Sequence, residues 1–297
     1  MRQITTVGLL VMALLTFVVA RSFAIDKTLP IKQSVIGLEK AHAHNDYDHT
    51  NPLFDALHHG FTRIEPDIYV LYKDPATGVL SDDFSYFKST GDTSRYVIEV
   101  GHNKGQYVGT LYDLYIKPLE QLKPGQFVFA SLPKPILYMI DMKTNDPDSV
   151  EFMNKYLAQY NNLFNNYNSV NMDKPVNVIL SGYNGSDFSK TDYDYLLATK
   201  DRYIGIDGRV DTPLYGQNKA PNLFPLISNG WGNNRSDTVF YKNIKDAHAN
   251  GHQIRFWGID DIPSTWEKLY DAGMDVISTD KLQDVENFLL SKKKAAK

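Results

Sequence analysis

Short apolar runs rich in β-branched residues recur along the chain and alternate with longer segments of helical periodicity. Runs of this kind predict strands, and the segments between them predict helices. The predicted strands are Val35–His42, Thr62–Leu71, Tyr96–Val100, Pro135–Met142, Val176–Leu180, Tyr203–Ile206, Gln253–Trp257 and Val276–Ser278. The predicted helices are Pro52–His59, Thr110–Leu122, Pro147–Asn165, Asp187–Thr199, Asp237–Asn250, Pro263–Ala272 and Leu282–Lys293.

The regular alternation of strands and helices indicates parallel βα units. Eight such units after residue 24 match a (β/α)8 barrel, or TIM barrel, which typically has about 250 residues. A doubly wound open sheet shows the same alternation, and periodicity does not separate the two. No composition shift or long linker divides residues 25–297, so we expect a single domain. In a barrel, the long connections Tyr72–Arg95 and Arg209–Asn222 would lie on the face that carries active sites.

Residues 1–24 have the pattern of a secretory signal peptide. Arg2 supplies an early cation, Val7–Ala20 is almost wholly apolar, and Ser22 and Ala24 are small residues where a signal peptidase requires them. An uncleaved membrane anchor is the alternative, although the apolar stretch is short for a membrane span. We therefore expect a secreted or periplasmic protein with a cleaved signal peptide.

The composition limits the chemistry that is available. None of the 297 residues is a cysteine, which excludes a disulfide scaffold, a zinc ribbon and a thiol nucleophile. Aromatic residues make up 12% of the chain and its net charge is −4, which is not the composition of a disordered protein. A pI near 6.1 argues against a nucleic-acid binder, for which a basic patch is typical.

Oxygen-bearing side chains stand at three of the first four predicted strands. Glu65 and Asp67 are two residues apart on the second strand, so both point to one side. Asp141 ends the fourth strand, and Asn45 follows the first. If these strands are neighbours in a barrel, three carboxylates and one amide oxygen meet at one rim. Because hard cations prefer oxygen ligands, the sequence predicts one divalent cation, Ca²⁺ or Mg²⁺, at this rim.

Histidines and a lysine flank this set of oxygen atoms. His42 ends the first strand and His44 follows it, His102 follows the third, and Lys143 shares a face with Asp141. Imidazoles titrate near pH ~6.5, which suits acid–base catalysis, and a lysine beside a metal would face a bound anion. Each of these residues, taken alone, more often has a structural role than a catalytic one. Their coincidence at four successive strand ends points to a site for phosphate-ester chemistry.

The same segments resemble a known superfamily of enzymes. The likeness rests on His42–Tyr47, Pro52–Leu57 with Gly60, Ile64–Asp67, Val100–His102, Ile140–Lys143, Phe256–Gly258 and Gly273–Asp280. These segments resemble the phosphatidylinositol-phospholipase-C-like phosphodiesterases, which include the glycerophosphodiester phosphodiesterases. The likeness is greatest to the branch that contains altered inheritance of mitochondria protein 6, and it covers most of the chain after residue 24.

The resemblance implies a TIM-barrel phosphodiesterase that uses one divalent cation, with two histidines as general base and general acid. The matched positions are His44 and His102 for the histidines, Asn45, Glu65, Asp67 and Asp141 for the metal, and Lys143 for a cation that faces the substrate. Which histidine is the base stays open at this point. His42 and Trp257 are further candidates for contact with the substrate.

Three positions depart from the glycerophosphodiester phosphodiesterase pattern. The tract His-Arg-Gly is absent, and His42 and His44 stand in its place. We favour His44 as the catalytic histidine because Asn45 beside it supplies a metal ligand. Asp141 occupies a position where those enzymes usually have glutamate, and Asn103 one where they commonly have aspartate.

We therefore expect a secreted monomeric phosphodiesterase that cleaves a glycerophosphodiester or a phospholipid headgroup. Its partner would be a small-molecule or lipid phosphodiester, with transient contact to a membrane surface and no nucleic acid. Two alternatives stay open. His42-Ala43-His44 also resembles the opening of zinc amidohydrolase barrels, although Val176–Leu180 and Tyr203–Ile206 lack the further histidines that such sites need. A non-catalytic secreted barrel that binds sugars or lipid headgroups is the other alternative.

Overall fold

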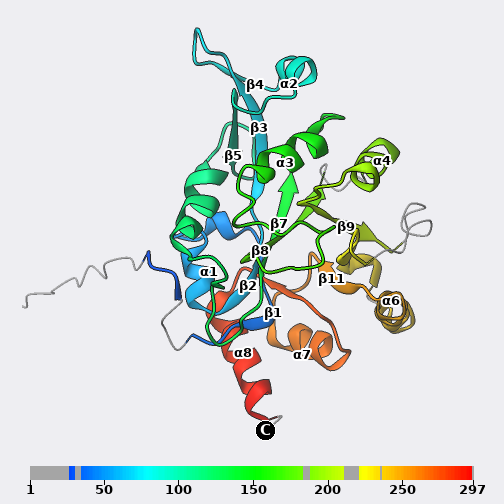
Figure 1. Ribbon diagram of the computed structural model, residues 1–297. Helices are drawn as coiled ribbons and strands as arrows, with labels where there is room; N and C mark the ends of the chain where they lie inside the picture. Colours follow the sequence, from blue (N-terminus) through cyan, green and yellow to red (C-terminus); the bar gives the residue numbers. More distant parts are fainter. Residues whose placement is uncertain (1–26, 31–34, 183–187, 211–220, 235, 296–297) are drawn as a thin grey trace, which may run out of the picture.

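The computed structural model describes residues 27–30, 35–182, 188–210, 221–234 and 236–295 (Figure 1). The predicted signal peptide, residues 1–24, lies outside these ranges, as does most of the predicted connection Arg209–Asn222. None of the helices in the described part of the chain combines the length and the apolar composition that a membrane crossing requires.

Parallel strands form a barrel at the centre of the molecule. In order around the barrel they are β1 (Leu38–Ala43), β2 (Phe61–Ile64), β7 (Ile136–Met142), β8 (Val176–Gly182), β9 (Gly205–Arg209), β10 (Leu226–Gly230), β11 (Gln253–Trp257) and β12 (Ile277–Thr279). β12 pairs with β1, and a bridge between Arg255 and Val276 joins β11 to β12, so the barrel closes. The predicted (β/α)8 barrel is thereby confirmed.

Helices cover the outside of the barrel (Figure 1). They are α1 (Phe54–His58), α3 (Ser149–Ala158), α4 (Lys190–Ala198), α6 (Asp237–Ala249), α7 (Pro263–Asp271) and α8 (Leu282–Ala295). Each overlaps a predicted helix. The predicted helix Thr110–Leu122 is instead a π-helical turn, η3 (Tyr112–Ile116), followed by a 3₁₀ turn, η4 (Lys117–Gln121). Pro118 lacks the backbone N–H that a continuous α-helix needs at this point.

One predicted barrel strand has another place in the fold, and one barrel strand was missed. The segment Tyr96–Val100, β5, pairs antiparallel with β3 (Asp67–Lys73), with Ile68 opposite Val100. It therefore belongs to an extension above the barrel and not to the barrel wall. The missed barrel strand is β10, Leu-Ile-Ser-Asn-Gly, whose two apolar residues are too few to predict a strand.

The extension is built from the long connection after the second barrel strand. It comprises β3, β4 (Leu80–Ser81), β5, β6 (Gly109–Thr110) and α2 (Ser85–Thr90), and it projects from one end of the barrel in Figure 1. β3 continues β2 beyond Pro66 and stays in register with β7, since Asp67 pairs with Asp141. The extension is thus a direct prolongation of the barrel wall.

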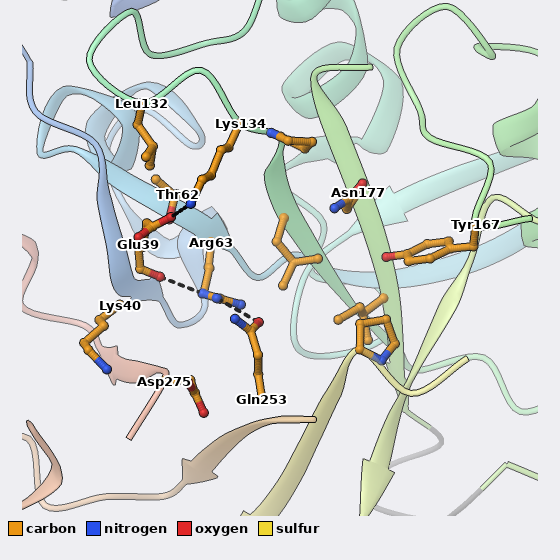
Figure 2. A pocket seen from close by; sticks show the side chains of 14 residues that line it. Glu39, Lys40, Thr62, Arg63, Leu132, Lys134, Tyr167, Asn177, Gln253 and Asp275 are labelled. Atoms are coloured by element: carbon orange, nitrogen blue, oxygen red, sulfur yellow. Dashed lines mark hydrogen bonds and ion pairs between the residues drawn. The ribbon is translucent and has the colours of Figure 1, made fainter. Parts of the chain in front are cut away.

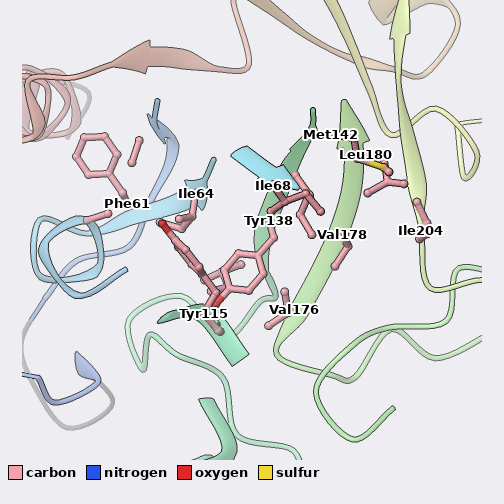
Figure 3. Close-up of a cluster of buried hydrophobic side chains, with 14 of the residues drawn as sticks. Phe61, Ile64, Ile68, Tyr115, Tyr138, Met142, Val176, Val178, Leu180 and Ile204 are labelled. Carbon is pink, nitrogen blue, oxygen red and sulfur yellow. Dashed lines mark hydrogen bonds between the residues drawn. The ribbon is translucent and has the colours of Figure 1, made fainter. Parts of the chain in front are cut away.

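Apolar side chains fill the space between the outer face of the strands and the surrounding segments (Figure 3). Phe61, Ile64, Tyr138 and Val178 are fully or almost fully buried there. Tyr115, on η3, packs edge-on against Tyr138, with 5.9 Å between ring centroids. Each such side chain stabilises the folded state by about 1.5–3 kcal/mol through removal of apolar surface from water.

A second aromatic cluster attaches the extension to α3. The ring of Phe152 lies 5.7 Å from Phe84, 5.2 Å from Phe87 and 4.9 Å from Tyr96, measured between centroids. All four side chains are buried. Phe152 therefore holds β5, and the segment that follows it, at a fixed position over the barrel.

We expect Phe152→Ala to lower the free energy of unfolding by about 3–5 kcal/mol, because it leaves a cavity among three aromatic rings. Urea unfolding followed by far-UV circular dichroism measures this change. Val170→Ala is the control, since Val170 is 99% exposed and its truncation is expected to change stability by less than about 0.5 kcal/mol. Equal stability of Phe152→Ala and the control would contradict the anchoring role.

Candidate active site

Alternation along the strands directs every second side chain into the barrel. On the second barrel strand and its continuation these residues include Glu65 and Asp67, and Asp141 is the register partner of Asp67 on β7. Oxygen atoms of the three carboxylates lie within 4.8 Å of one another. The structure thus brings together the three carboxylates that the sequence predicted at one rim.

Asp67 is the most crowded of the three. Its Oδ2 accepts hydrogen bonds from Tyr47 Oη at 2.8 Å and His102 Nδ1 at 2.9 Å, and it forms an ion pair with Lys143 Nζ at 2.9 Å. Its Oδ1 is buried and has no hydrogen-bond partner among the described residues. A buried carboxylate oxygen without a partner costs about 1–3 kcal/mol or more. A bound cation would remove this cost.

Glu65 is held by two basic side chains from other strands. Its Oε2 lies 2.8 Å from Arg255 Nη1 and 2.5 Å from His42 Nε2. Burial alone would raise the pKa of Glu65, but Arg255 and His42 outweigh it and hold that pKa well below its usual range. Glu65 is therefore an ionised carboxylate at any ordinary pH.

The charges in this part of the barrel do not cancel. Glu65, Asp67 and Asp141 carry three negative charges, and Arg255 and Lys143 supply two positive ones. Burial and the neighbouring carboxylates raise the pKa of Asp141 against the opposing effect of Lys143, which indicates that the acids are crowded. A divalent cation fits this donor set, because it would meet hard oxygen ligands, a net negative charge and a carboxylate oxygen that has no partner among the described residues.

His42 is fully buried and lies beside Glu65 rather than in an open cleft. Burial and the nearby Arg255 lower the pKa of His42 to about 4, so its imidazole is neutral at neutral pH. That His42 contacts the substrate stays a prediction, and the structure gives it a buried place beside Glu65. Its Nε2 lies 2.5 Å from Glu65 Oε2 and 3.2 Å from Arg255 Nη1, so His42 helps to position that carboxylate.

His44, two residues later on the same side of the chain, reaches a cleft of about 370 Å³. Its Nδ1 lies 2.8 Å from Asp280 Oδ1. Burial lowers the pKa of His44, but the hydrogen bond to Asp280 and the charge of Glu65 outweigh it, so the pKa is raised. Because Asp280 holds Nδ1, Nε2 is the nitrogen left for proton transfer.

His102 reaches the carboxylates from the extension. It follows β5, and because β5 runs antiparallel to β3, its carboxyl end returns to the level of Asp67. His102 lines a separate hollow of about 460 Å³, which Asn45 and Tyr47 also line. His102 therefore reaches the predicted rim, although not from a parallel barrel strand.

Asn45 and Lys143 lie beside the carboxylates in different ways. Asn45 has left-handed backbone angles, and its Oδ1 lies 3.0 Å from the hydroxyl of Tyr47, which also contacts Asp67. Lys143 is almost buried and lies 2.7 Å from Asp141 Oδ2. As placed, Lys143 neutralises the carboxylates, and its contact with a substrate phosphate stays a prediction.

The far wall of the 370 Å³ cleft consists of residues that the sequence analysis missed, with the exception of Trp257. Asp207 Oδ2 accepts hydrogen bonds from Ser181 Oγ at 2.9 Å and Arg209 Nη1 at 2.5 Å. Its Oδ1 is buried without a partner among the described residues. The predicted strand ended at Ile206, one residue before Asp207; extending it would have placed Asp207 and Arg209 on one side.

The amino-acid sequence is similar to a group of fungal proteins. The AIM6-like phosphodiesterase domain family matches residues 31–84, the segment that contains His44, Glu65 and Asp67. Altered inheritance of mitochondria protein 6 from Eremothecium gossypii is 25% identical over 282 residues, which cover 84% of this chain and 69% of that protein. The protein of the same name from Lachancea thermotolerans is 25% identical over 308 residues, covering 86% and 66%. The resemblance expected from the sequence is confirmed.

The fold is similar to that of a solved enzyme structure. The crystal structure of a glycerophosphodiester phosphodiesterase from Parabacteroides distasonis superposes with a TM-score of 0.52, covering 86% of this chain and 98% of that one. The two sequences are 16% identical, so the likeness concerns the fold.

The turn after β1 contains a buried acid, Asp46, whose protonation we expect to affect stability. Its Oδ2 accepts from Leu53 N at 2.6 Å and Tyr115 Oη at 2.9 Å, and burial raises its pKa to about 7. A raised pKa stabilises the folded state below pH ~4, and this stabilisation is lost as the pH rises to about 7. Relative to Asp46→Asn, the native protein should lose up to about 4 kcal/mol over this range.

Urea unfolding of both proteins at several pH values between 4 and 8 checks this expectation. The difference in unfolding free energy should change up to about pH 7 and then stay constant. Parallel profiles over the whole range would show that Asp46 does not titrate in this window.

Proposed function

We propose that the protein is a metal-dependent phosphodiesterase that hydrolyses a glycerophosphodiester or a phospholipid headgroup. The observation that carries the proposal is the buried Oδ1 of Asp67, which has no partner among the described residues, within a trio of carboxylates and beside two histidines that are each oriented by a carboxylate. The sequence similarity to a phosphodiesterase domain and the barrel fold support the same reaction class.

Glu65, Asp67 and Asp141 would hold the cation, with the amide oxygen of Asn45 as a further ligand. When bound, a divalent cation neutralises the negative charge of a phosphodiester and so lowers the barrier to nucleophilic attack. The donor set favours calcium or magnesium over zinc, because the candidate ligand atoms that lie within 4.8 Å of one another in the described part of the chain are all carboxylate oxygens. This is the reason to prefer a phosphodiesterase to a zinc amidohydrolase.

His44 is the proposed general base. Asp280 fixes the proton on Nδ1, so Nε2 presents its lone pair to the cleft, and the imidazolium that forms is stabilised by Asp280 and Glu65. The proton comes from a water or from a neighbouring hydroxyl of the substrate. In the second case, attack within the substrate would first form a cyclic phosphate.

His102 is the proposed general acid. Its Nδ1 is hydrogen-bonded to Asp67, so Nε2 is the atom that would protonate the leaving alkoxide. Its side chain is 60% exposed, which lets the leaving group depart directly into solvent.

The cleft wall is the proposed binding site for the substrate's alcohol group. The Oδ1 of Asp207, which has no hydrogen-bond partner among the described residues, is an acceptor, and Arg209 beside it is a donor. Trp257, which is 45% exposed, offers a ring surface at the same cleft. A polyol such as glycerol, with hydroxyl groups and apolar C–H faces, fits these groups.

The two histidines should respond differently to the leaving group. A p-nitrophenolate leaves without protonation, whereas the alkoxide of a glycerophosphodiester needs an acid. We expect His44→Ala to lower kcat by about 10²–10⁴-fold on both bis(p-nitrophenyl) phosphate and glycerophosphocholine. We expect His102→Ala to lower kcat by a similar factor on glycerophosphocholine, and to leave kcat on bis(p-nitrophenyl) phosphate nearly unchanged.

His59→Ala serves as the matched control, because His59 pairs with Glu286 away from the cleft. Steady-state kinetics on both diesters measures the result. Near-normal turnover by both His44→Ala and His102→Ala would reject the mechanism, and no turnover of any diester by the native protein would favour a binding barrel.

The metal requirement is tested by removal and re-addition. Protein stripped with EDTA should lose its activity and regain it with Ca²⁺ or Mg²⁺. Asp67→Asn should weaken binding of the activating cation by at least about tenfold in calorimetry, because it removes an anionic ligand. Asp173→Asn, at an exposed position, should bind like the native protein. Full activity in EDTA, or equal cation affinity in both variants, would contradict the proposal.

Export is part of the same proposal. A cationic start, an apolar stretch and small residues before Ile25 support cleavage after Ala24. Intact mass of the protein recovered from the medium or periplasm should correspond to a chain that begins at Ile25. Recovery of the full-length chain from the membrane fraction would support an uncleaved anchor instead.

A further inference from the structure

A second cavity opens at the end of the barrel opposite the carboxylates (Figure 2). Its volume is about 520 Å³, larger than the cleft beside His44. Its lining residues come from the beginnings of the strands that carry the active site at their ends. Lys40 precedes His42 on β1, and Arg63 precedes Glu65 on the second barrel strand.

Arg63 is the central polar group of this cavity. It is 92% buried, since only 8% of its surface is exposed. Its Nε donates to the backbone oxygen of Glu39 at 2.9 Å, and its Nη2 donates to Gln253 Oε1 at 3.0 Å. No carboxylate lies within ion-pair distance of its guanidinium among the described residues. A buried cation supported only by neutral oxygens is costly to the fold.

The two acids that line the cavity are engaged elsewhere. Glu39 Oε1 pairs with Lys134 Nζ at 2.5 Å. Asp275 Oδ2 lies 2.8 Å from His248 Nε2 and accepts the backbone N–H of Ile254 at 2.9 Å. Burial lowers the pKa of Arg63 to about 10, and Asp275 and Glu39 oppose this only from a distance, so Arg63 stays charged. The positive charge that faces the cavity is therefore only partly compensated.

Tyr167 adds a polar group whose hydroxyl has no hydrogen-bond partner among the described residues. It is 8% exposed, and its hydroxyl is buried with no hydrogen bond to the described residues. In Figure 2 the hydroxyl end of its ring points toward the cavity. Apolar surface completes the lining, from Leu132, Pro135, Leu137, Ile179 and Pro225. A cavity with apolar walls and a few placed polar groups has the character of a small-molecule site.

We propose that this cavity binds a small organic anion at a site separate from the catalytic cleft. A carboxylate or phosphate group of the ligand pairs with the guanidinium of Arg63, whose planar fork suits either group. The apolar body of the ligand lies against Leu137 and Ile179. Tyr167 supplies a further hydrogen bond once its ring adjusts to the ligand.

The two sites are divided by a layer of side chains across the barrel. Met139, Leu226 and Val276 pack there with Leu137 and Ile179. Arg255 contacts both the sulfur of Met139 and the carboxylate of Glu65 through its Nη1. Occupancy of the second cavity therefore needs no phosphodiesterase activity, and the inference stands independently of the proposed reaction.

Binding of benzoate, phenyl phosphate and uncharged benzyl alcohol tests the inference on the full chain. Isothermal titration calorimetry should show saturable binding of at least one anion, with benzyl alcohol at least tenfold weaker. Arg63→Gln should weaken anion binding at least tenfold and Tyr167→Phe a few-fold. Lys143→Gln, which alters only the catalytic end, should leave this binding unchanged.

A second measurement does not depend on the folding of a variant. In the native protein labelled at leucine and isoleucine methyl groups, the anion should shift the NMR signals of Leu137 and Ile179. Absence of saturable binding up to 10 mM for both anions would overturn the proposal. It would also be overturned if binding were unaffected by both Arg63→Gln and Tyr167→Phe, or if it moved no methyl signal of the cavity.

Discussion

Three carboxylates crowded inside a barrel are the constraint on which the rest of this structure depends. Like charges at such distances repel, and burial adds the cost of lost hydration. Basic side chains offset this cost. Arg255 and His42 contact Glu65, and Lys143 pairs with both Asp67 and Asp141. The compensation is incomplete, because one oxygen of Asp67 has no partner among the described residues. That residual negative character is what would attract a cation.

The extension after the second barrel strand brings a histidine to the carboxylates from outside the barrel wall. A parallel barrel presents side chains at its strand ends, and each new strand must cross the outside of the barrel before it returns. The antiparallel pairing of β5 with β3 avoids this crossing and brings His102 directly beside Asp67. The aromatic contacts of Phe152 fix the hairpin on α3, so that a mostly exposed histidine keeps a defined position.

The alternation of side chains along each strand determines which residues stand at each of the two ends of the barrel. Side chains two residues apart on a strand occupy successive layers, so β1 and the second barrel strand contribute to both ends. Arg63 and Glu65 illustrate the contrast. At the carboxyl end Glu65 is one of three carboxylates that share the two cations Arg255 and Lys143, whereas at the amino end Arg63 has no acid within ion-pair distance among the described residues. Apolar residues between them, such as Met139 and Ile179, keep the two environments apart.

The sequence by itself determined the alternation of strands and helices and the residue types that stand at the candidate site. Alternating apolar runs predicted seven of the eight barrel strands, counting Thr62–Leu71 as the second, and the spacing of Glu65 and Asp67 placed both acids on one side. Local pattern suffices there because strand period and residue type are encoded within a few neighbouring positions.

Only the tertiary structure decided which of the candidates meet. It turned β5 into a hairpin strand, buried His42 and left His44 at the cleft, and added Arg255 and Asp207 from strands late in the chain. These outcomes depend on strand direction, burial and contacts between residues far apart in sequence. No window of neighbouring residues contains that information, because the energies that select it arise only when the barrel closes.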